Sequence, residues 1–158
     1  MKNKRIITTV FCLISCCMLL LASCKKYVSS TYLSLENNSW YIDDTLHYAF
    51  DIDDLNNTYT LKYNVRINED YRYRNLFLFT TTTLPDNTLQ NDTLQFILSD
   101  EHGNSYGRGL SGQKEIVFTI DNTCTFSQKG AYNIDIQHGM RDNPLEGIKK
   151  LGLVIEKN

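Results

Sequence analysis

Apolar and polar residues alternate one by one through much of this chain. Residues 59–67 place Tyr, Leu, Tyr, Val and Ile at odd positions and Thr, Lys, Asn and Arg at even ones. Residues 46–52 repeat the pattern with Leu46, Tyr48, Phe50 and Ile52. A period of two predicts β-strands with one face in a core and one in water.

Five further strands are expected, one from a continuous apolar and β-branched run at residues 76–82 and four from shorter alternating runs. They are predicted around Leu76–Thr82, Leu94–Leu98, Ile116–Ile120, Tyr132–Ile136 and Leu151–Ile155. Turn residues such as Pro85-Asp86-Asn87 separate them, and no helical periodicity runs for three turns. We therefore expect an all-β fold, an antiparallel β-sandwich of the Ig-like or jelly-roll type with about seven or eight strands. A closed barrel is the alternative.

The N-terminus has the layout of an exported lipoprotein. Basic residues up to Arg5 precede an apolar run from Ile6 to Leu21, and Leu21-Ala22-Ser23-Cys24 follows. Small residues before a cysteine suit cleavage by the lipoprotein signal peptidase. Residues 1–23 are thus predicted to be a signal peptide, with Cys24 as the lipid attachment site; a transmembrane anchor is the alternative, although the run is slightly short for one.

The segment after Cys24 is polar and lacks periodicity. We expect residues 24–36 to be the lipidated cysteine and a flexible tether, whose twelve residues from 25 on would reach about 40 Å when extended. Residues 37–158 then form a single domain, large enough to fold without disulfides. Only Cys124 lies in that domain; a small buried core residue is the favoured interpretation, and a reactive thiol the alternative.

Charge argues against nucleic acid as a partner. The signal peptide carries three of the sixteen basic residues and none of the eighteen acidic ones, so the mature chain has a net charge of about −5. We expect the lipid to be the membrane contact.

Candidate catalytic and metal sites are weak. Gly103-Asn104-Ser105-Tyr106-Gly107 fits the G-x-S-x-G pattern, which would make Ser105 an esterase nucleophile. The glycine-rich continuation does not suit a helix, so a hairpin or bulge is favoured. His47, His102 and His138 form no metal-ligand pair, and Asp51, Asp53, Asp54 and Asn56 miss the EF-hand spacing. No catalytic residue, metal or cofactor is predicted.

Aromatic residues offer a second kind of binding. Trp40, Tyr41, Tyr71 and Tyr73, if exposed, would stack on sugars or anchor a protein; otherwise they fill the core. Thr45 and Thr93 each follow Asp and precede Leu, a pattern typical of bacterial O-glycosylation sites; the alternative is an ordinary strand that begins with Asp-Thr.

Several blocks carry a resemblance to a known family. They are Val65-Arg66-Ile67-Asn68, Asp70-Tyr71-Arg72-Tyr73-Arg74-Asn75-Leu76, Asp92-Thr93-Leu94, Gly107-Arg108-Gly109, Gly130-Ala131-Tyr132, Gln137-His138-Gly139-Met140-Arg141-Asp142-Asn143-Pro144-Leu145 and Leu151-Gly152-Leu153-Val154-Ile155-Glu156-Lys157. Together with Leu21-Ala22-Ser23-Cys24 they resemble the gliding motility lipoprotein H (GldH) family of Bacteroidota, over about residues 37–157.

The resemblance implies a non-enzymatic outer-membrane lipoprotein that serves the gliding apparatus and its coupled secretion system. It brings no catalytic residues. Lys25 and Lys26 stand where an acidic surface-export signal would be, so we expect the domain to face the periplasm.

Within those blocks, arginine and tyrosine are the candidates for contact with envelope partners, because both dominate interface hot spots. The candidates are Arg66, Tyr71, Tyr73 and Arg141. Arg66 and Arg141 could equally pair with Asp70, Asp92 or Asp142 to hold loops. A structural role is expected for Asn75 and Asp92. The leading hypothesis is an adaptor of the gliding and secretion machinery; the alternative is a lipid-anchored glycan-binding module.

Overall fold

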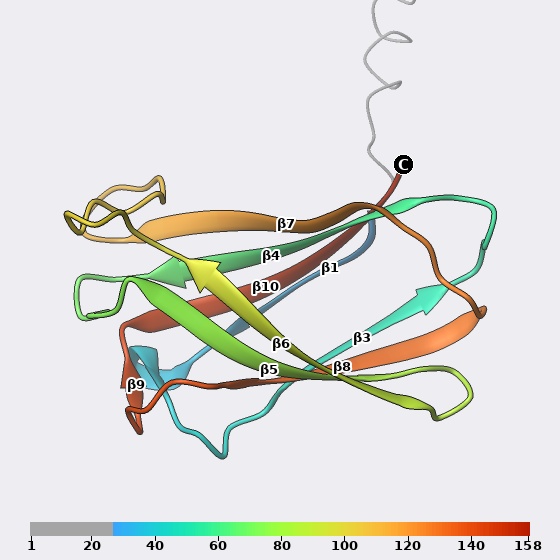
Figure 1. Ribbon diagram of the computed structural model, residues 1–158, viewed down its shortest axis with the longest axis horizontal. Coiled ribbons are helices and arrows are strands. Elements are labelled where there is room, and N and C mark those ends of the chain that lie inside the picture. The colour runs from blue at the N-terminus through green and yellow to red at the C-terminus, as the bar shows by residue number, and fades with distance from the viewer. Residues whose placement is uncertain (1–26) are drawn as a thin grey trace, which may run out of the picture.

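Two four-stranded antiparallel sheets pack face to face in the computed structural model, which describes residues 27–158 (Figure 1). The predicted signal peptide and Cys24 lie outside the described residues. The strands are β1 (Tyr27–Ser34), β2 (Ser39–Trp40), β3 (Leu46–Ile52), β4 (Tyr59–Ile67), β5 (Asn75–Thr83), β6 (Leu89–Ile97), β7 (Lys114–Cys124), β8 (Gly130–His138), β9 (Leu145–Glu146) and β10 (Ile148–Lys157).

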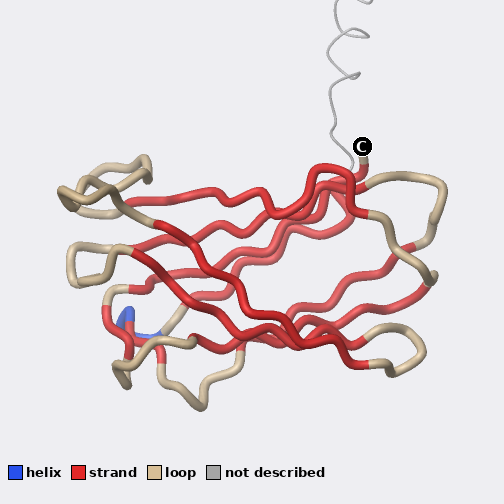
Figure 2. The backbone as a smooth tube through the Cα atoms, in the orientation of Figure 1, coloured by secondary structure: helices blue, strands red, loops and turns tan. Residues whose placement is uncertain are grey.

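The first sheet has the order β1-β10-β4-β7 and the second β3-β8-β5-β6. A third, two-stranded sheet joins β2 to β9, beside the short 3-10 helix η1 (Glu36–Asn38). Figure 2 shows that nearly all the rest of the backbone outside the strands is loops at the two ends of the sandwich. The predicted antiparallel β-sandwich is therefore confirmed.

Alternation of side chains builds the core, as the sequence predicts. In β3 every second residue from Leu46 to Ile52 is buried, and β4 contributes Tyr59, Tyr63, Val65 and Ile67. β10 is buried almost throughout because it is an inner strand, with β1 on one side and β4 on the other. All seven strands predicted from the pattern are present.

The predicted tether is wrong for residues 27–34. They form β1, which pairs with β10 from Tyr27 opposite Glu156 to Ser34 opposite Lys150. β1 is an edge strand whose residues are all partly or fully exposed. Its two faces therefore differ too little in polarity to leave a period of two in the sequence.

Cys124 also departs from its favoured interpretation. It lies at the end of β7 and is only partly buried, rather than enclosed in the core. Desolvation, followed by the nearby Asp121 carboxylate, raises the pKa of its thiol. Because the thiolate is the reactive form, this shift lowers the reactivity of Cys124 at neutral pH.

Candidate partner-binding site

Three loops meet at one end of the sandwich, and they contain most of the predicted contact residues. They connect β4 to β5 (residues 68–74), β6 to β7 (98–113) and β8 to β9 (139–144). Tyr27 and the C-terminus lie toward the opposite end, as the pairing of Tyr27 with Glu156 requires (Figure 1). The loop end is on the left in that view, and we call it the distal end.

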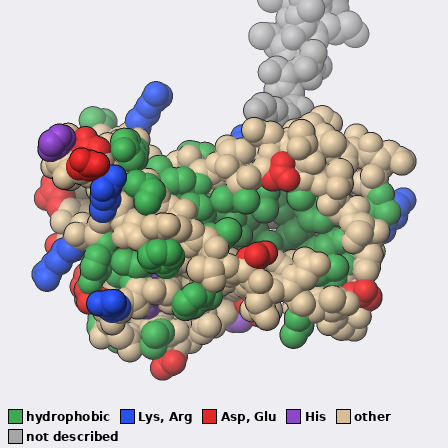
Figure 3. Space-filling model, in the orientation of Figure 1, with side chains coloured by type: hydrophobic (Ala, Val, Ile, Leu, Met, Phe, Trp, Pro, Cys, Tyr) green, Lys and Arg blue, Asp and Glu red, His purple; other side chains and the backbone are tan. Residues whose placement is uncertain are grey.

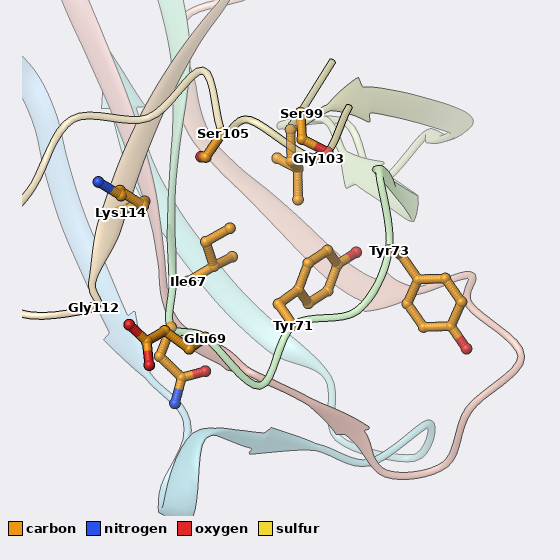
Figure 4. A pocket seen from close by; sticks show the side chains of 11 residues that line it. Ile67, Glu69, Tyr71, Tyr73, Ser99, Gly103, Ser105, Gly112 and Lys114 are labelled. Carbon is orange, nitrogen blue, oxygen red and sulfur yellow. The ribbon is translucent and has the colours of Figure 1, made fainter. Parts of the chain in front are cut away.

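A cavity of about 330 Å³ opens between two of these loops (Figure 4). Its lining is Ile67, Asn68, Glu69, Tyr71, Tyr73, Leu98, Ser99, Gly103, Ser105, Gly112 and Lys114. The lining combines an apolar floor with side chains of both charges at the rim. Such a mixture suits binding of a polar group that carries an apolar neighbour.

Tyr71 is held firmly in this cavity. Its hydroxyl donates a 2.7 Å hydrogen bond to the backbone carbonyl of Asn75, and burial raises the pKa of that hydroxyl. Gly147, with φ of +87°, lies so close that a Cβ on it would overlap the Tyr71 backbone. Tyr71 thus shapes the wall of the cavity, and Asn75 contributes through its backbone.

Tyr73 lies beside Tyr71, in an edge-to-face arrangement with 6.0 Å between ring centroids. Its ring projects away from the other labelled lining residues in Figure 4. A hydrogen bond to the Asp142 carboxylate, followed by desolvation, raises the pKa of the Tyr73 hydroxyl, while the positive charges of Arg72 and Arg141 act in the opposite direction. Arg141 is exposed. The structure therefore brings Tyr71, Tyr73 and Arg141 together, and adds Asp142 to them.

Arg66 lies elsewhere, on the outer face of the first sheet. Its Nε and Nη2 both donate to one carboxylate oxygen of Glu115, at 3.1 Å and 2.5 Å. The expected partners Asp70, Asp92 and Asp142 are wrong, because the register places Arg66 of β4 directly opposite Glu115 of β7. The sequence alone does not reveal how β4 and β7 are aligned, so the pairing of Arg66 with Glu115 could not be predicted from it.

Trp40 is fully buried and cannot stack on a sugar. Its indole N–H donates to the backbone carbonyl of Asp44 at 2.8 Å, and its ring packs edge-to-face against His138. Trp40, the largest of the aromatic side chains that were candidates for stacking on a sugar, is therefore not available for that role. Asp92, on β6, is exposed, and its backbone carbonyl accepts a hydrogen bond from the Thr80 hydroxyl.

Ser105 does not lie at a strand-to-helix turn. Its hydroxyl accepts the N–H of Gly107 at 3.1 Å, and the chain continues to a bridge between Arg108 and Glu115. His102 lies in the same loop, which connects β6 to β7, and its side chain is exposed. The segment is a looped connection, in agreement with the favoured interpretation of the motif.

The remaining candidate ligands are used for structure. Asp54 accepts hydrogen bonds from the Asn56 backbone and from Lys157 Nζ, both at 3.0 Å, and these bonds lower the pKa of its carboxyl group. His47 pairs with Asp135 at 2.7 Å. Between residues 27 and 158, no three His, Cys, Asp or Glu side chains gather as a metal site. Over the same residues, no helix has the length and apolarity to cross a bilayer.

The fold and this end of it define a small antiparallel β-sandwich with a cavity built by two of its loops. The family model for GldH lipoprotein matches residues 27–155, nearly all of the described chain. The chain belongs to the GldH lipoprotein family.

Two relatives match over nearly their whole length. A gliding motility lipoprotein GldH homolog from Christiangramia forsetii is 34% identical over 89% of this chain and 91% of its own. The gliding motility lipoprotein GldH of Flavobacterium johnsoniae is 30% identical over 88% of this chain and 91% of its own. Among solved structures, dimeric latent PorU from Porphyromonas gingivalis matches with a TM-score of 0.37 and 12% identity, covering 87% of this chain and 13% of that one. That TM-score is too low to support an inference.

Proposed function

We propose that this chain is a lipid-anchored, non-enzymatic adaptor of the cell envelope that serves gliding motility and the protein secretion coupled to it. Membership of the GldH family supports the link to motility. The observation that carries the adaptor role is the separation between the distal end, with Tyr71, Tyr73 and Arg141, and the end where Tyr27 enters the fold.

The proposed anchor would orient the domain. Cys24 is three residues from Tyr27, and three residues span at most about 11 Å. Because β1 begins at Tyr27, a lipid on Cys24 would hold the near end of the sandwich close to the membrane surface. The distal end would then point away from the membrane, where other envelope proteins are accessible.

Three further parts of the proposal rest on the sequence and the contacts. Lys25 and Lys26 after Cys24, in place of acidic residues, support an outer-membrane lipoprotein that faces the periplasm. Ser105 lies in a looped connection, not at the strand-to-helix turn that a G-x-S-x-G nucleophile needs, which supports a non-enzymatic role. The cluster of half-buried tyrosines with the exposed Arg141 at the distal end supports protein partners, since tyrosine and arginine carry much of the free energy of association at interfaces.

Gene deletion in a gliding host tests the proposal. We expect deletion to reduce colony spreading and the amount of secreted protein, and the full chain to restore both. A Tyr73→Ala, Arg141→Ala double variant should restore neither fully at equal abundance in the membrane. Normal spreading and secretion after deletion would contradict the proposed function.

A matched control removes one tyrosine and one basic residue at the near end, the end of the sandwich where Tyr27 begins β1. Tyr27 and Lys129 are both exposed there, so Tyr27→Ala with Lys129→Ala removes one tyrosine and one basic side chain without touching the distal end. This control should behave as the wild type. A Cys24→Ala variant, in turn, should no longer incorporate radiolabelled fatty acid, because it lacks the thiol that would carry the lipid.

A further inference from the structure

The sandwich is closed on one side and open on the other. On the closed side, the edge strands β1 and β3 contact each other. On the other side, the edge strands β6 and β7 diverge along their length (Figure 1). Figure 3 shows hydrophobic side chains lining a hollow between the two layers on the open side.

Core side chains are left partly uncovered there. Phe96 of β6 stacks on Phe118 of β7, with 4.3 Å between ring centroids, and so joins the two edges near one end. The inward-facing apolar residues that remain only partly buried include Leu61, Leu94, Phe118 and Phe126. Apolar core surface exposed in a row of this kind marks an interaction site more often than scattered single residues do.

A groove of about 650 Å³ follows the first half of β7. It is lined by Ile97, Tyr106, Arg108, Glu115, Ile116, Val117 and Phe118. Tyr106 is 60% exposed and Val117 55% exposed. Because the groove contains both Val117 and Phe118, which lie on opposite faces of β7, it runs along the edge of the strand itself.

The backbone of β7 points hydrogen-bonding groups into this groove. The N–H of Glu115 donates to the carbonyl of Arg108 at 2.9 Å, and the N–H of Arg108 donates back at 3.0 Å. The backbone groups of Glu115 therefore point away from β4. Because the backbone N–H and C=O groups of successive residues point to alternate sides of a strand, the backbone groups of Val117 and Thr119 also point away from β4. β7 is the last strand of its sheet in the described chain, so these groups face an open edge.

We propose that the edge of β7 binds an extended segment of another protein by strand addition. The segment would continue the short bridge that Arg108 begins, and would bond to the backbone of Val117 and Thr119. Alternate apolar side chains of the segment would fill the hollow beside Leu94 and Phe118. Strand addition obtains affinity from the main chain and specificity from alternate side-chain pockets. The proposal does not depend on the motility role.

A second copy of this chain fits the edge less well. In a dimer, two β7 strands related by a two-fold axis would pair edge to edge. The backbone of Glu115 could not take part in this pairing in either copy, because it is already bonded to Arg108 of its own chain. Beyond Thr119, the pairing of β7 with β4 is interrupted by register shifts opposite Leu61. Only about three residues would remain for symmetric pairing, whereas strands typically have about five. A foreign segment meets the same limits on β7 but does not bring a second set of them, so its own ends are free to extend into the hollow.

Site-specific photo-cross-linking tests the proposal in intact cells of the host. The full chain would carry p-benzoylphenylalanine in place of Val117, or in place of Leu89 as the control. Leu89 is also an exposed apolar residue of an edge strand, 61% exposed, but does not line the groove. We expect Val117 to cross-link to one segment of one protein, identified by mass spectrometry, with apolar residues at alternate positions.

Thr119→Pro provides the second arm. Proline on an edge strand is tolerated where the lost N–H faces outward, but it removes a donor that strand addition needs. We expect the yield of the Val117 cross-link to fall about tenfold, the effect of losing one or two hydrogen bonds. Val117→Asp, compared with Leu89→Asp, repeats the test in case Thr119→Pro unfolds the chain; the cross-linker then replaces Tyr106, which lines the same groove.

Each other outcome overturns the proposal. Cross-links from Val117 to lipid would indicate a membrane-facing edge, and cross-links to this same chain a dimer. Equal yields from Val117 and Leu89 would indicate no site. A cross-link that persists in Thr119→Pro, with the thermal midpoint unchanged, would exclude main-chain recognition. Loss of spreading on gene deletion is measured separately, so the two proposals fail independently.

Discussion

The ring of Tyr32 on β1 lies against Gly152 on β10. The register places these two residues opposite each other, and Asn64 of β4 follows in the same row. The Asn64 side-chain amide donates a hydrogen bond to the Tyr32 hydroxyl, and Lys150 Nζ lies 5.8 Å from the ring centroid. An aromatic ring that covers a glycine in the neighbouring strand compensates for the missing side chain.

Gly152→Ala should therefore destabilise the fold by disturbing the packing of β1 on β10. A Cβ at this position would overlap the Tyr32 ring, so the ring must move. We expect the free energy of unfolding to fall by about 1–3 kcal/mol, the usual cost of overpacking. Urea unfolding of a soluble form, without the signal peptide and with Cys24→Ser, measures it. In a Tyr32→Ala background the added methyl group has no ring to displace, so equal costs in both backgrounds would contradict this account.

Gly147→Ala should destabilise the protein more than Gly103→Ala. Both glycines have positive φ, +87° and +82°, but a Cβ at Gly147 would overlap the Tyr71 backbone, whereas at Gly103 it meets no atom within 4 Å. Gly103→Ala should cost about 1 kcal/mol from backbone strain alone. Gly147→Ala should cost at least about 2 kcal/mol and loosen the distal end. Thermal unfolding of the two variants side by side measures the difference, and similar midpoints would argue against the close approach.

His138 should make stability depend on pH. Its side chain is buried, and burial lowers its pKa below the ordinary value of 6.5. The unfolded chain then binds the proton more readily than the folded chain. The free energy of unfolding should fall as the pH falls below about 6.5 and through the lower pKa of the folded state.

Urea unfolding between pH 7.5 and pH 5 tests this effect. His138→Gln should be less stable at pH 7.5 but should lose less stability on acidification than the wild type. His102→Gln, a substitution of an exposed histidine in the 98–113 loop, is the matched control and should keep the wild-type slope. An unchanged slope in His138→Gln would assign the pH dependence to other groups.

The ion pair of Arg66 with Glu115 should contribute little to stability. Both side chains are about one-third exposed, and ion pairs at such positions are typically worth less than about 1 kcal/mol. A double-mutant cycle with Arg66→Ala and Glu115→Ala measures the coupling free energy. A coupling well above about 1 kcal/mol would mean that the pair organises the edge of β7. A small coupling together with lost motility in Arg66→Ala would place Arg66 at a partner contact.

Local pattern was sufficient for most of the strands and for the general fold. In β3 one face is buried and the other is exposed to solvent, which produces a period of two in the sequence. In β4, an inner strand, the apolar and polar residues still alternate although both faces are largely covered. The absence of a helical period and the turn residues between runs then favoured a sandwich. Strand β1 was missed for the same physical reason, since an edge strand with two partly exposed faces carries no such period.

The neighbours of each side chain were decided only by the tertiary structure. Arg66 meets Glu115, 49 residues away, because β4 and β7 pair in one particular register, and Tyr73 meets Asp142 because two loops end at the same corner. Trp40 reads as an exposed ring or a core residue until its contact with His138 buries it. Which edges of the sandwich close and which stay open depends in turn on how two sheets pack.

By itself, the sequence of this protein determined which segments become strands and which of their faces are apolar, because these are properties of consecutive residues. The distal cluster and the open edge of β7 arise from contacts between distant segments, and such contacts follow from packing of the whole chain.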